Sequence, residues 1–401
     1  MQHANKNCVY KYVVGDEDVD LDLYPFLRRY KDGRIERVLK SPFVPASDNP
    51  TTNRGVATRD VVIDHSTGMS ARLFLPSLAG DDDSPAFCRT YHRYATSLAA
   101  LAGALVVSVE YRLAPEHPIP AAYDDTWSAL RWATSSLTTY PWLTNHADLR
   151  RTFLAGGNIA YHTAVRASRR RDDVVTGVEG VVMVQPYFWG TELLPSEAAS
   201  DGARTMLPAY GVDWLWPLVT AVQAGNEDTR INPTDEEVAS LTSTCRRVMV
   251  AVAEKDTLRE RGVRLFDRVR ECYDLTGGGE VTLVESEGED HGFHLYKAHG
   301  EHRAVHQPHT TGAGEERRRL AFAACVQAFR DVFGYGMDMK QPSCTAGPIC
   351  MAPAYRRDTS KIGRRGKAPA ATSNKPNYGL FKGPAAAATT FPGVHGIKNF
   401  F

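Results

Sequence analysis

Apolar positions along residues 1–335 follow two alternating periods, which predicts strands and helices in turn. Continuous apolar runs rich in β-branched residues, typical of strands buried on both faces of a parallel sheet, occupy residues 104–111, 180–186 and 247–253. A shorter run at 281–285 predicts the last strand. Helical spacing extends over residues 91–102, 121–132, 158–168 and 315–333. Strands that alternate with helices indicate an open, mostly parallel α/β sheet with helices on both faces.

The N-terminal part of the chain departs from this alternation. Residues 19–50 are interpreted as a cap segment, with a short helix at 19–27 and a strand at 33–38. Residues 60–64 and 70–75 are apolar or alternating and enclose a turn-like Ser-Thr-Gly sequence. This pattern predicts an antiparallel hairpin at a sheet edge.

The domain organisation follows from changes in composition. Residues 189–241, between two predicted buried strands, are aromatic and irregular, which favours a helical cap insertion that covers a pocket. With it, residues 1–335 form one α/β domain. Residues 336–401 are rich in Pro, Gly, Ala, Lys and Arg without an apolar period, and we interpret them as a basic, low-complexity, disordered tail. A partner-binding segment at 377–401, with four Phe and one Tyr, is the alternative.

The charges of the chain balance, with 47 Lys and Arg against 47 Asp and Glu. This balance gives no bulk electrostatic case for nucleic acid or an anionic membrane as a partner. Basic groups at 356–357 and 364–367 suit a nuclear-import signal or nucleic acid, but a solvated tail is the simpler interpretation.

The seven cysteines are scattered, odd in number and without C-x-x-C spacing, which is typical of reduced thiols inside the cell. No N-terminal apolar segment resembles a signal peptide, and no apolar run is long enough to span a bilayer. We therefore expect a cytoplasmic protein, with the nucleus as an alternative address, and no membrane partner.

A strand–turn–helix joint at residues 151–162 is the centre of the predicted fold. A β-prone run at 152–154 meets Gly156-Gly157 and passes directly into the helical pattern that begins at Asn158. A nucleophile elbow at such a joint needs G-x-S-x-G, because the tight turn lifts the serine hydroxyl above the sheet. No serine, cysteine or threonine lies between Ala155 and Ala160.

Three motifs carry a resemblance to a known family. Residues 105–118, Leu-Val-Val-Ser-Val-Glu-Tyr-Arg-Leu-Ala-Pro-Glu-His-Pro, with Pro-Ala-Ala-Tyr-Asp-Asp at 120–125, resemble the plant carboxylesterase branch of the hormone-sensitive-lipase-like α/β-hydrolases. The gibberellin receptors belong to the same branch. Residues 253–262 and Glu289-Asp290-His291-Gly292-Phe293 resemble that family's acid and histidine motifs. The likeness extends over residues 19–333.

The resemblance implies a Ser-His-Asp triad with a backbone oxyanion hole. It assigns the orienting acid to Asp256, after the strand at 247–253, and the general base to His291, after the strand at 281–285. We therefore expect Asp256 and His291 side by side at the C-terminal edge of the sheet, within hydrogen-bonding distance.

Two parts of the family pattern are missing. The His-Gly-Gly-Gly oxyanion loop should follow a strand between Leu75 and Tyr91, where only residues 76–90 remain, with one glycine. The family's Gly-Asp-Ser-Ala-Gly-Gly-Asn is reduced to Gly156-Gly157-Asn158. The sheet should therefore lack one strand, so that it either closes up or splits. Ser84 and Cys88 lie in a loop without the rigid turn that a nucleophile requires.

Further histidines follow His291. His302 and His306 are spaced four apart, which suits a metal site, but Gly300 and Pro308 interrupt the helix that would hold them. We interpret this stretch as a solvated loop and expect neither a metal nor a cofactor.

The sequence thus predicts a carboxylesterase-like α/β-hydrolase, with ester hydrolysis by a Ser-His-Asp triad as the family reaction, that is catalytically impaired. A non-catalytic small-molecule-binding protein, like the hormone receptors of the family, is one alternative. Those receptors keep the serine and lose the histidine, whereas this chain keeps His291. An incomplete gene product of an active carboxylesterase is the other alternative. The expected partner is a small-molecule ester or a hormone-like ligand.

Overall fold

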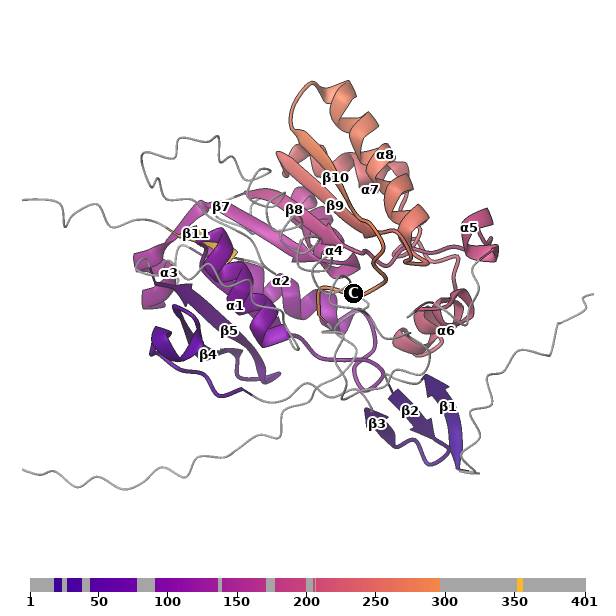
Figure 1. Cartoon of the computed structure of the whole chain (residues 1–401), viewed down its shortest axis with the longest axis horizontal. Helices are drawn as coiled ribbons and strands as arrows, with labels where there is room; N and C mark the ends of the chain where they lie inside the picture. Colours follow the sequence, from indigo (N-terminus) through magenta and orange to yellow (C-terminus); the bar gives the residue numbers. More distant parts are fainter. Residues whose placement is uncertain are drawn as a thin grey trace, which may run out of the picture.

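The strands in the described part of the chain form three sheets (Figure 1). The computed structural model describes residues 18–23, 27–37, 44–77, 91–135, 139–170, 177–199, 205, 207–295 and 352–355. The α-helices are α1 (Tyr91–Ala102), α2 (Ala121–Thr134), α3 (Pro141–His146), α4 (Asn158–Arg169), α5 (Pro195–Ala198), α6 (Ala209–Val219), α7 (Asp235–Ser240) and α8 (Arg259–Thr276). Two short 3-10 helices are η1 (Pro50–Asn53) and η3 (Leu241–Ser243).

The largest sheet has the strand order β10-β9-β8-β7-β11. Its strands are β7 (Ala147–Gly156), β8 (Val178–Val184), β9 (Arg247–Ala253), β10 (Glu280–Ser286) and β11 (Ala352–Tyr355). Strands β7 to β10 run parallel, whereas β11 pairs antiparallel with β7. The mostly parallel α/β sheet predicted from the apolar runs is confirmed.

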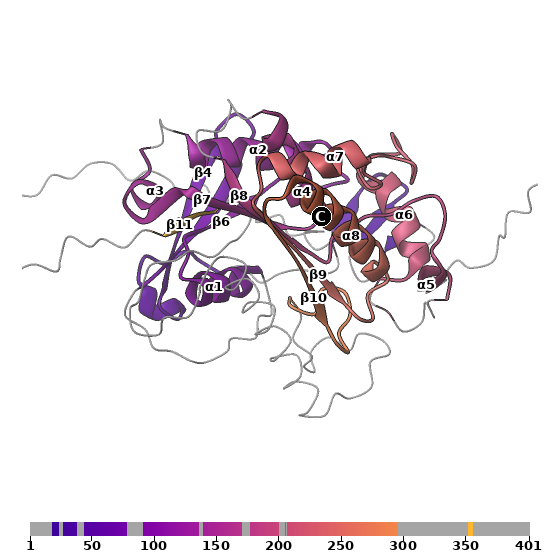
Figure 2. The same cartoon turned by 90° about the horizontal axis from the view of Figure 1, so that it is seen from above.

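Helices cover both faces of this sheet, which explains why its central strand β9 is apolar at every position after Arg247. On β9, Val248 and Val250 belong to a core cluster that includes buried residues of α2, α4 and α8. The alternating residues Met249 and Ala251 belong to a second cluster, with residues of α1. Figure 2 shows α1 on the opposite side of the sheet from α2 and α4.

A three-stranded antiparallel sheet has the order β4-β5-β6. It consists of β4 (Val56–Asp64), β5 (Met69–Pro76) and β6 (Val106–Glu110). The predicted hairpin is confirmed as β4 and β5. The expectation that residues 104–111 belong to a parallel sheet is wrong for the pairing in the described residues, where β6 pairs with β5 antiparallel. A parallel neighbour of β6 would have to be the strand that the family pattern contains and this chain is expected to lack.

The sheet is split between β6 and β7, one of the two outcomes expected when an inner strand is lost. Strand β11 pairs with the edge of β7 that faces away from β8 (Figure 2). At β11 the structure has a strand where the sequence predicts a disordered tail. The rest of residues 336–401, the helix predicted at 315–333 and residues 78–90 lie outside the described residues.

The N-terminal segment forms a small antiparallel sheet of β1 (Val19–Leu23), β2 (Leu27–Tyr30) and β3 (Ile35–Arg37). The short helix predicted at 19–27 is wrong. The sequence Val-Asp-Leu-Asp-Leu alternates with a period of two, which suits a strand. The strand predicted at 33–38 is present as β3.

Residues 189–241 contain helices α5, α6 and α7, and the 3-10 helix η3 begins at the last of these residues. Their buried aromatic side chains, among them Trp189 and Trp216, form a third core cluster together with Leu27 of β2, Ile119 and Ile159. The insertion therefore packs against the N-terminal sheet and the beginnings of α2 and α4.

Candidate active site

Asp256 lies in the turn between β9 and α8. Its carboxylate is buried, with 5% of the residue exposed. Asp256 Oδ1 accepts a hydrogen bond from the Leu258 backbone N–H at 2.9 Å. This bond fixes the side chain and leaves Oδ2 directed at a second partner.

That partner is His291, which is 4% exposed and lies in the loop after β10. His291 Nδ1 is 2.9 Å from Asp256 Oδ2. Because a carboxylate only accepts, a neutral His291 carries its proton on Nδ1 and leaves the lone pair on Nε2. This is the tautomer of a general base. The two residues that the sequence paired are therefore in contact, and their catalytic role stays a prediction.

Backbone hydrogen bonds tie together the two loops that carry this pair. The Lys255 N–H donates to the Glu289 carbonyl at 2.9 Å, and the Glu254 N–H donates to the Ser286 carbonyl at 3.1 Å. Because β9 and β10 are adjacent parallel strands, both loops leave the sheet at the same edge. The positions of Asp256 and His291 are therefore fixed by backbone hydrogen bonds at the edge of the sheet as well as by side-chain packing.

Gln185, which follows β8, holds the histidine loop from a third strand. Its side-chain Nε2 donates to the Asp290 carbonyl at 3.1 Å, and its Oε1 accepts from the Gly292 N–H at 2.7 Å. The residue is 5% exposed. The sequence analysis placed Gln185 inside a strand and missed its contact with the histidine loop. Its two partners lie more than a hundred positions away in the chain, and no local pattern links residues so far apart.

His294 is a second imidazole beside the pair. Burial, together with the nearby His291, lowers the pKa of His294 to about 3. Its ring lies 5.2 Å from that of Tyr94 in α1. His294 is therefore neutral near pH 7 and adds no charge next to His291.

The joint between β7 and α4 has the predicted strand–turn–helix geometry. Strand β7 ends at Gly156, α4 begins at Asn158, and Gly157 alone separates them. A one-residue turn of this kind carries no hydroxyl or thiol here. The turn at the C-terminal end of β7, where the family places its nucleophile, therefore consists of glycines and provides no nucleophilic side chain.

Asn158 uses its amide at this joint for structural contacts. The side chain is fully buried. Its Nδ2 donates to the carbonyls of Tyr187, at 3.1 Å, and Arg230, at 2.7 Å, and its Oδ1 accepts from the Tyr123 hydroxyl at 2.5 Å. These contacts connect α4 with α2 and with the cap insertion.

His162, one turn further along α4, makes a similar contact. Its Nε2 lies 2.7 Å from the Arg230 carbonyl, so Nε2 donates the proton. Burial is the main reason that the pKa of His162 is lowered to about 4. The first turns of α4 therefore carry neutral groups that bind the cap insertion.

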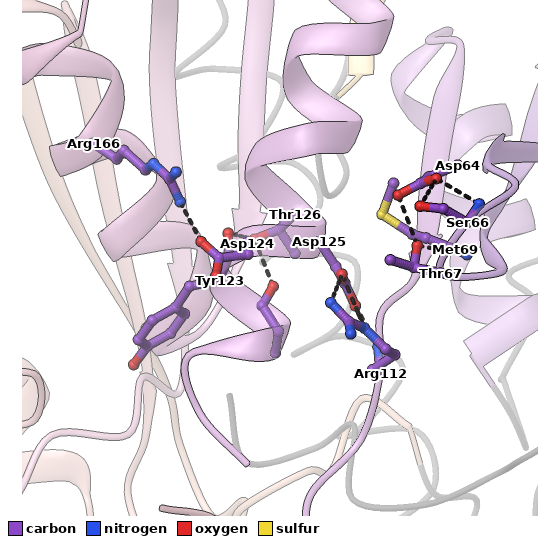
Figure 3. A network of polar contacts seen from close by, with 11 residues as sticks. Asp64, Ser66, Thr67, Met69, Arg112, Tyr123, Asp124, Asp125, Thr126 and Arg166 are labelled. Atoms are coloured by element: carbon purple, nitrogen blue, oxygen red, sulfur yellow. Dashed lines mark hydrogen bonds and ion pairs between the residues drawn. The ribbon is translucent and has the colours of Figure 1, made fainter. Parts of the chain in front are cut away.

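The segment between β6 and α2 is held by ion pairs (Figure 3). The Arg112 guanidinium binds the Asp125 carboxylate, with the shortest contact at 2.7 Å, and the Arg112 N–H donates to the same carboxylate at 2.8 Å. Arg166 of α4 binds Asp124 at 2.8 Å. The first motif of the resemblance therefore serves to attach residues 112–120 to α2, and α2 to α4.

Other candidate residues from the sequence are not part of this site. Ser84, Cys88, His302 and His306 lie outside the described residues. Within the described ranges, no three His, Cys, Asp or Glu side chains gather as a metal site. No helix in the described part of the chain has the length and apolar character needed to cross a bilayer.

Comparisons with known proteins agree with this architecture. Residues 85–295 match the family described as alpha/beta hydrolase fold. A thermostable esterase from Pseudomonas putida has a similar structure, with a TM-score of 0.51 and 18% sequence identity, over 67% of this chain and 82% of that one. The chain therefore belongs to the α/β-hydrolases.

Proteins of similar sequence show which family within the α/β-hydrolases the chain belongs to. The 2-hydroxyisoflavanone dehydratase of Glycyrrhiza echinata is 36% identical over 308 residues, which cover 70% of this chain and 91% of that protein. Probable carboxylesterase 2 of Arabidopsis thaliana is 34% identical over 301 residues, with the same coverage of 70% and 91%. Within the α/β-hydrolases, the chain is a member of the plant carboxylesterase family that is related to hormone-sensitive lipase.

Proposed function

We propose that this chain is a carboxylesterase-family protein that has lost ester hydrolysis but keeps the acid–base half of the site. The observation that carries the proposal is the β7–α4 joint. Between Gly156 and Asn158 there is only Gly157, and none of the three can carry an acyl group. The ligand we propose for it is a small-molecule ester.

The expected loss in the rate of ester hydrolysis is large. Hydrolysis in this family proceeds through an acyl-serine, and removal of a triad member leaves only weak catalysis from the rest of the site. Loss of oxyanion donors costs about a further hundredfold or more. His291 alone can act on water as a weak general base, without the electrostatic stabilisation that usually lowers this barrier most.

The test is active-site labelling. The full chain is incubated with a fluorophosphonate probe, beside the His291→Ala variant and an active plant carboxylesterase as positive control. We expect labelling of the positive control only, and equal background turnover of a short-chain aryl ester by wild type and His291→Ala. Stoichiometric labelling of the wild type would overturn the proposal, and the labelled peptide would identify the nucleophile.

A second candidate activity is proton transfer without an acyl intermediate. It is favoured by the intact Asp256–His291 pair together with the name of one relative, a dehydratase. In an elimination of water, a base removes a proton from carbon and the neighbouring hydroxyl departs with the electron pair of its C–O bond. The proton that the base removed converts it to water, so no serine is required. The test is conversion of 2-hydroxyisoflavanone, followed by loss of water in the mass spectrum. Turnover that disappears in His291→Ala supports this activity, and equal rates in both proteins exclude it.

A further inference from the structure

Gln185 has a backbone conformation that separates it from the strand it follows. Its N–H donates to the Ala251 carbonyl at 2.8 Å, which continues the pairing of β8 with β9. Its φ is 43°, in the left-handed region that residues with a side chain seldom adopt. A sheet residue would keep a negative φ, so the chain leaves the strand at this residue and turns its side chain toward the loop after β10.

The side chain binds both peptide groups of His291. The Asp290 carbonyl belongs to the peptide group on the N-terminal side of His291, and the Gly292 N–H belongs to the one on its C-terminal side. One amide group therefore fixes the backbone of the histidine on both sides. A primary amide suits this arrangement, because it offers a donor and an acceptor next to each other.

The order of the strands shows what this contact does. The loop that carries His291 leaves from β10, Asp256 follows β9, and Gln185 follows β8. Two strand spacings, about 10 Å, separate β10 from β8. To reach Gln185, the histidine loop has to cross the end of β9, and Asp256 lies at that end.

We propose that Gln185 is a positioning residue that holds His291 over Asp256. It acts through the backbone of His291 and touches neither the reacting atoms of the ring nor the carboxylate. The consequence for catalysis rests on the acid–base role proposed above. The geometric inference does not, because it can be tested without any turnover.

The readout is the proton on His291 Nδ1, which gives a downfield NMR signal when it is held in a hydrogen bond to a buried carboxylate. The full chain is used, and the signal is assigned by its disappearance in His291→Gln. Gln185→Met keeps the size of the side chain and removes both contacts. Gln185→Gly also removes them and adopts a positive φ readily.

In both variants we expect the Nδ1 proton to exchange with water at least about tenfold faster, because two hydrogen bonds that close the loop are lost. Gln223→Met, at an exposed position, is the matched control and should leave the signal unchanged. Val182→Ala, in the core of β8, controls for lower stability and should also keep the signal. If Gln185→Gly folds and its Nδ1 proton exchanges at the wild-type rate, the proposal is wrong.

Failure of this experiment and failure of the proposed function are distinguishable. An unchanged Nδ1 signal in the Gln185 variants would refute the positioning role whatever the protein catalyses. Labelling of the wild type by the fluorophosphonate would refute the proposed loss of hydrolysis and leave the role of Gln185 intact.

Discussion

The two halves of the inherited site bind their polar groups to different parts of the molecule. At the acid–base corner, defined here as Asp256, His291 and Gln185, each side chain binds the loop that leaves β9 or the loop that leaves β10. At the β7–α4 joint, Asn158 and His162 bind the cap insertion. The hydrogen bonds of the corner do not involve the joint, whereas the joint attaches α4 to the cap insertion.

If the nucleophile has been lost, as we propose, this difference explains why the acid–base half of the site persists. The contacts of Asp256 and His291 stabilise the loops that hold them, so these residues contribute to the fold whether or not a substrate is cleaved. Removing one member of a buried pair leaves the other without a partner, which costs more than the pair itself contributes. A serine at an elbow makes no such contribution, because its hydroxyl has to remain accessible.

The largest effect is expected when the nucleophile is restored. Inserting Asp-Ser-Ala-Gly between Gly156 and Gly157 recreates the family's elbow sequence. If the corner is competent, fluorophosphonate labelling should rise from background to a measurable rate. It should remain about a hundredfold or more below that of an active relative, because the oxyanion loop is still missing.

Two controls accompany this insertion. Asp-Ala-Ala-Gly in the same place, and the serine insertion combined with His291→Ala, should both stay at background. A folded insertion variant that is not labelled would show that the corner no longer has the geometry of a general base.

The next effect concerns the joint. Asn158→Ala removes three hydrogen bonds of a fully buried side chain, and the Tyr123 hydroxyl loses its acceptor there. We expect the free energy of unfolding to fall by about 3–4 kcal/mol. Urea denaturation measures this, with the exposed Asn145→Ala as control, which should change it by less than about 0.5 kcal/mol. A loss of less than about 1 kcal/mol would contradict the structural role of the joint.

Acid should weaken the same attachment. The pKa of His162 is lowered from 6.5 to about 4 in the folded protein. Between those values the unfolded chain binds a proton that the folded protein does not, so the stability is complete above pH 6.5 and falls as the pH drops to 4. For this partly exposed group the loss reaches at most about 3 kcal/mol.

His162→Gln provides the measurement, since an amide can still donate to the Arg230 carbonyl but does not titrate. The slope of unfolding free energy against pH should decrease by up to about 1.4 kcal/mol per pH unit between pH 6.5 and 4. His117→Gln, at an exposed position, should leave the slope unchanged. His294, whose pKa is lowered to about 3, accounts for part of the slope that remains.

The smallest effect is expected at the corner. Asp256→Asn keeps the size of the side chain and its acceptor for the Leu258 N–H, but loses the charge that faces His291. We expect a loss of about 1–2 kcal/mol in unfolding free energy, with the exposed Asp274→Asn as control. A loss greater than that of Asn158→Ala would reverse the comparison between corner and joint.

Strands and their order along the chain were predictable where local pattern and burial agree. The run that forms β9 is apolar in every position after Arg247 because both of its faces are covered. Asp256 and His291 could be paired in advance because each follows its own parallel strand, and such strands end at one edge of the sheet. The alternation in residues 19–23 was also present in the sequence, and the prediction of a helix there gave it too little weight.

Contacts between distant residues were not predictable in this way. Gln185 was predicted inside the strand at 180–186, and only its left-handed φ and its two bonds to the histidine loop reveal another role. Asn158 was predicted only as the start of a helix, although its amide binds backbone carbonyls far along the chain. Strand β11, Ala-Pro-Ala-Tyr, lacks the β-branched residues that indicate β8 and β9, and its pairing depends on the free edge of β7, which is distant in the chain.

That strand has a consequence for synthesis on the ribosome. Strands β7 to β10 and their helices have emerged once residue 286 has left the exit tunnel, yet the outer edge of β7 obtains its partner only when Tyr355 has left it as well. During this interval the outer edge of β7 presents backbone groups without their strand partner, and such an edge attracts other extended chains. A nascent chain stalled after residue 286 but before residue 352 has left the tunnel should therefore bind chaperones longer than one stalled after Tyr355 has left it.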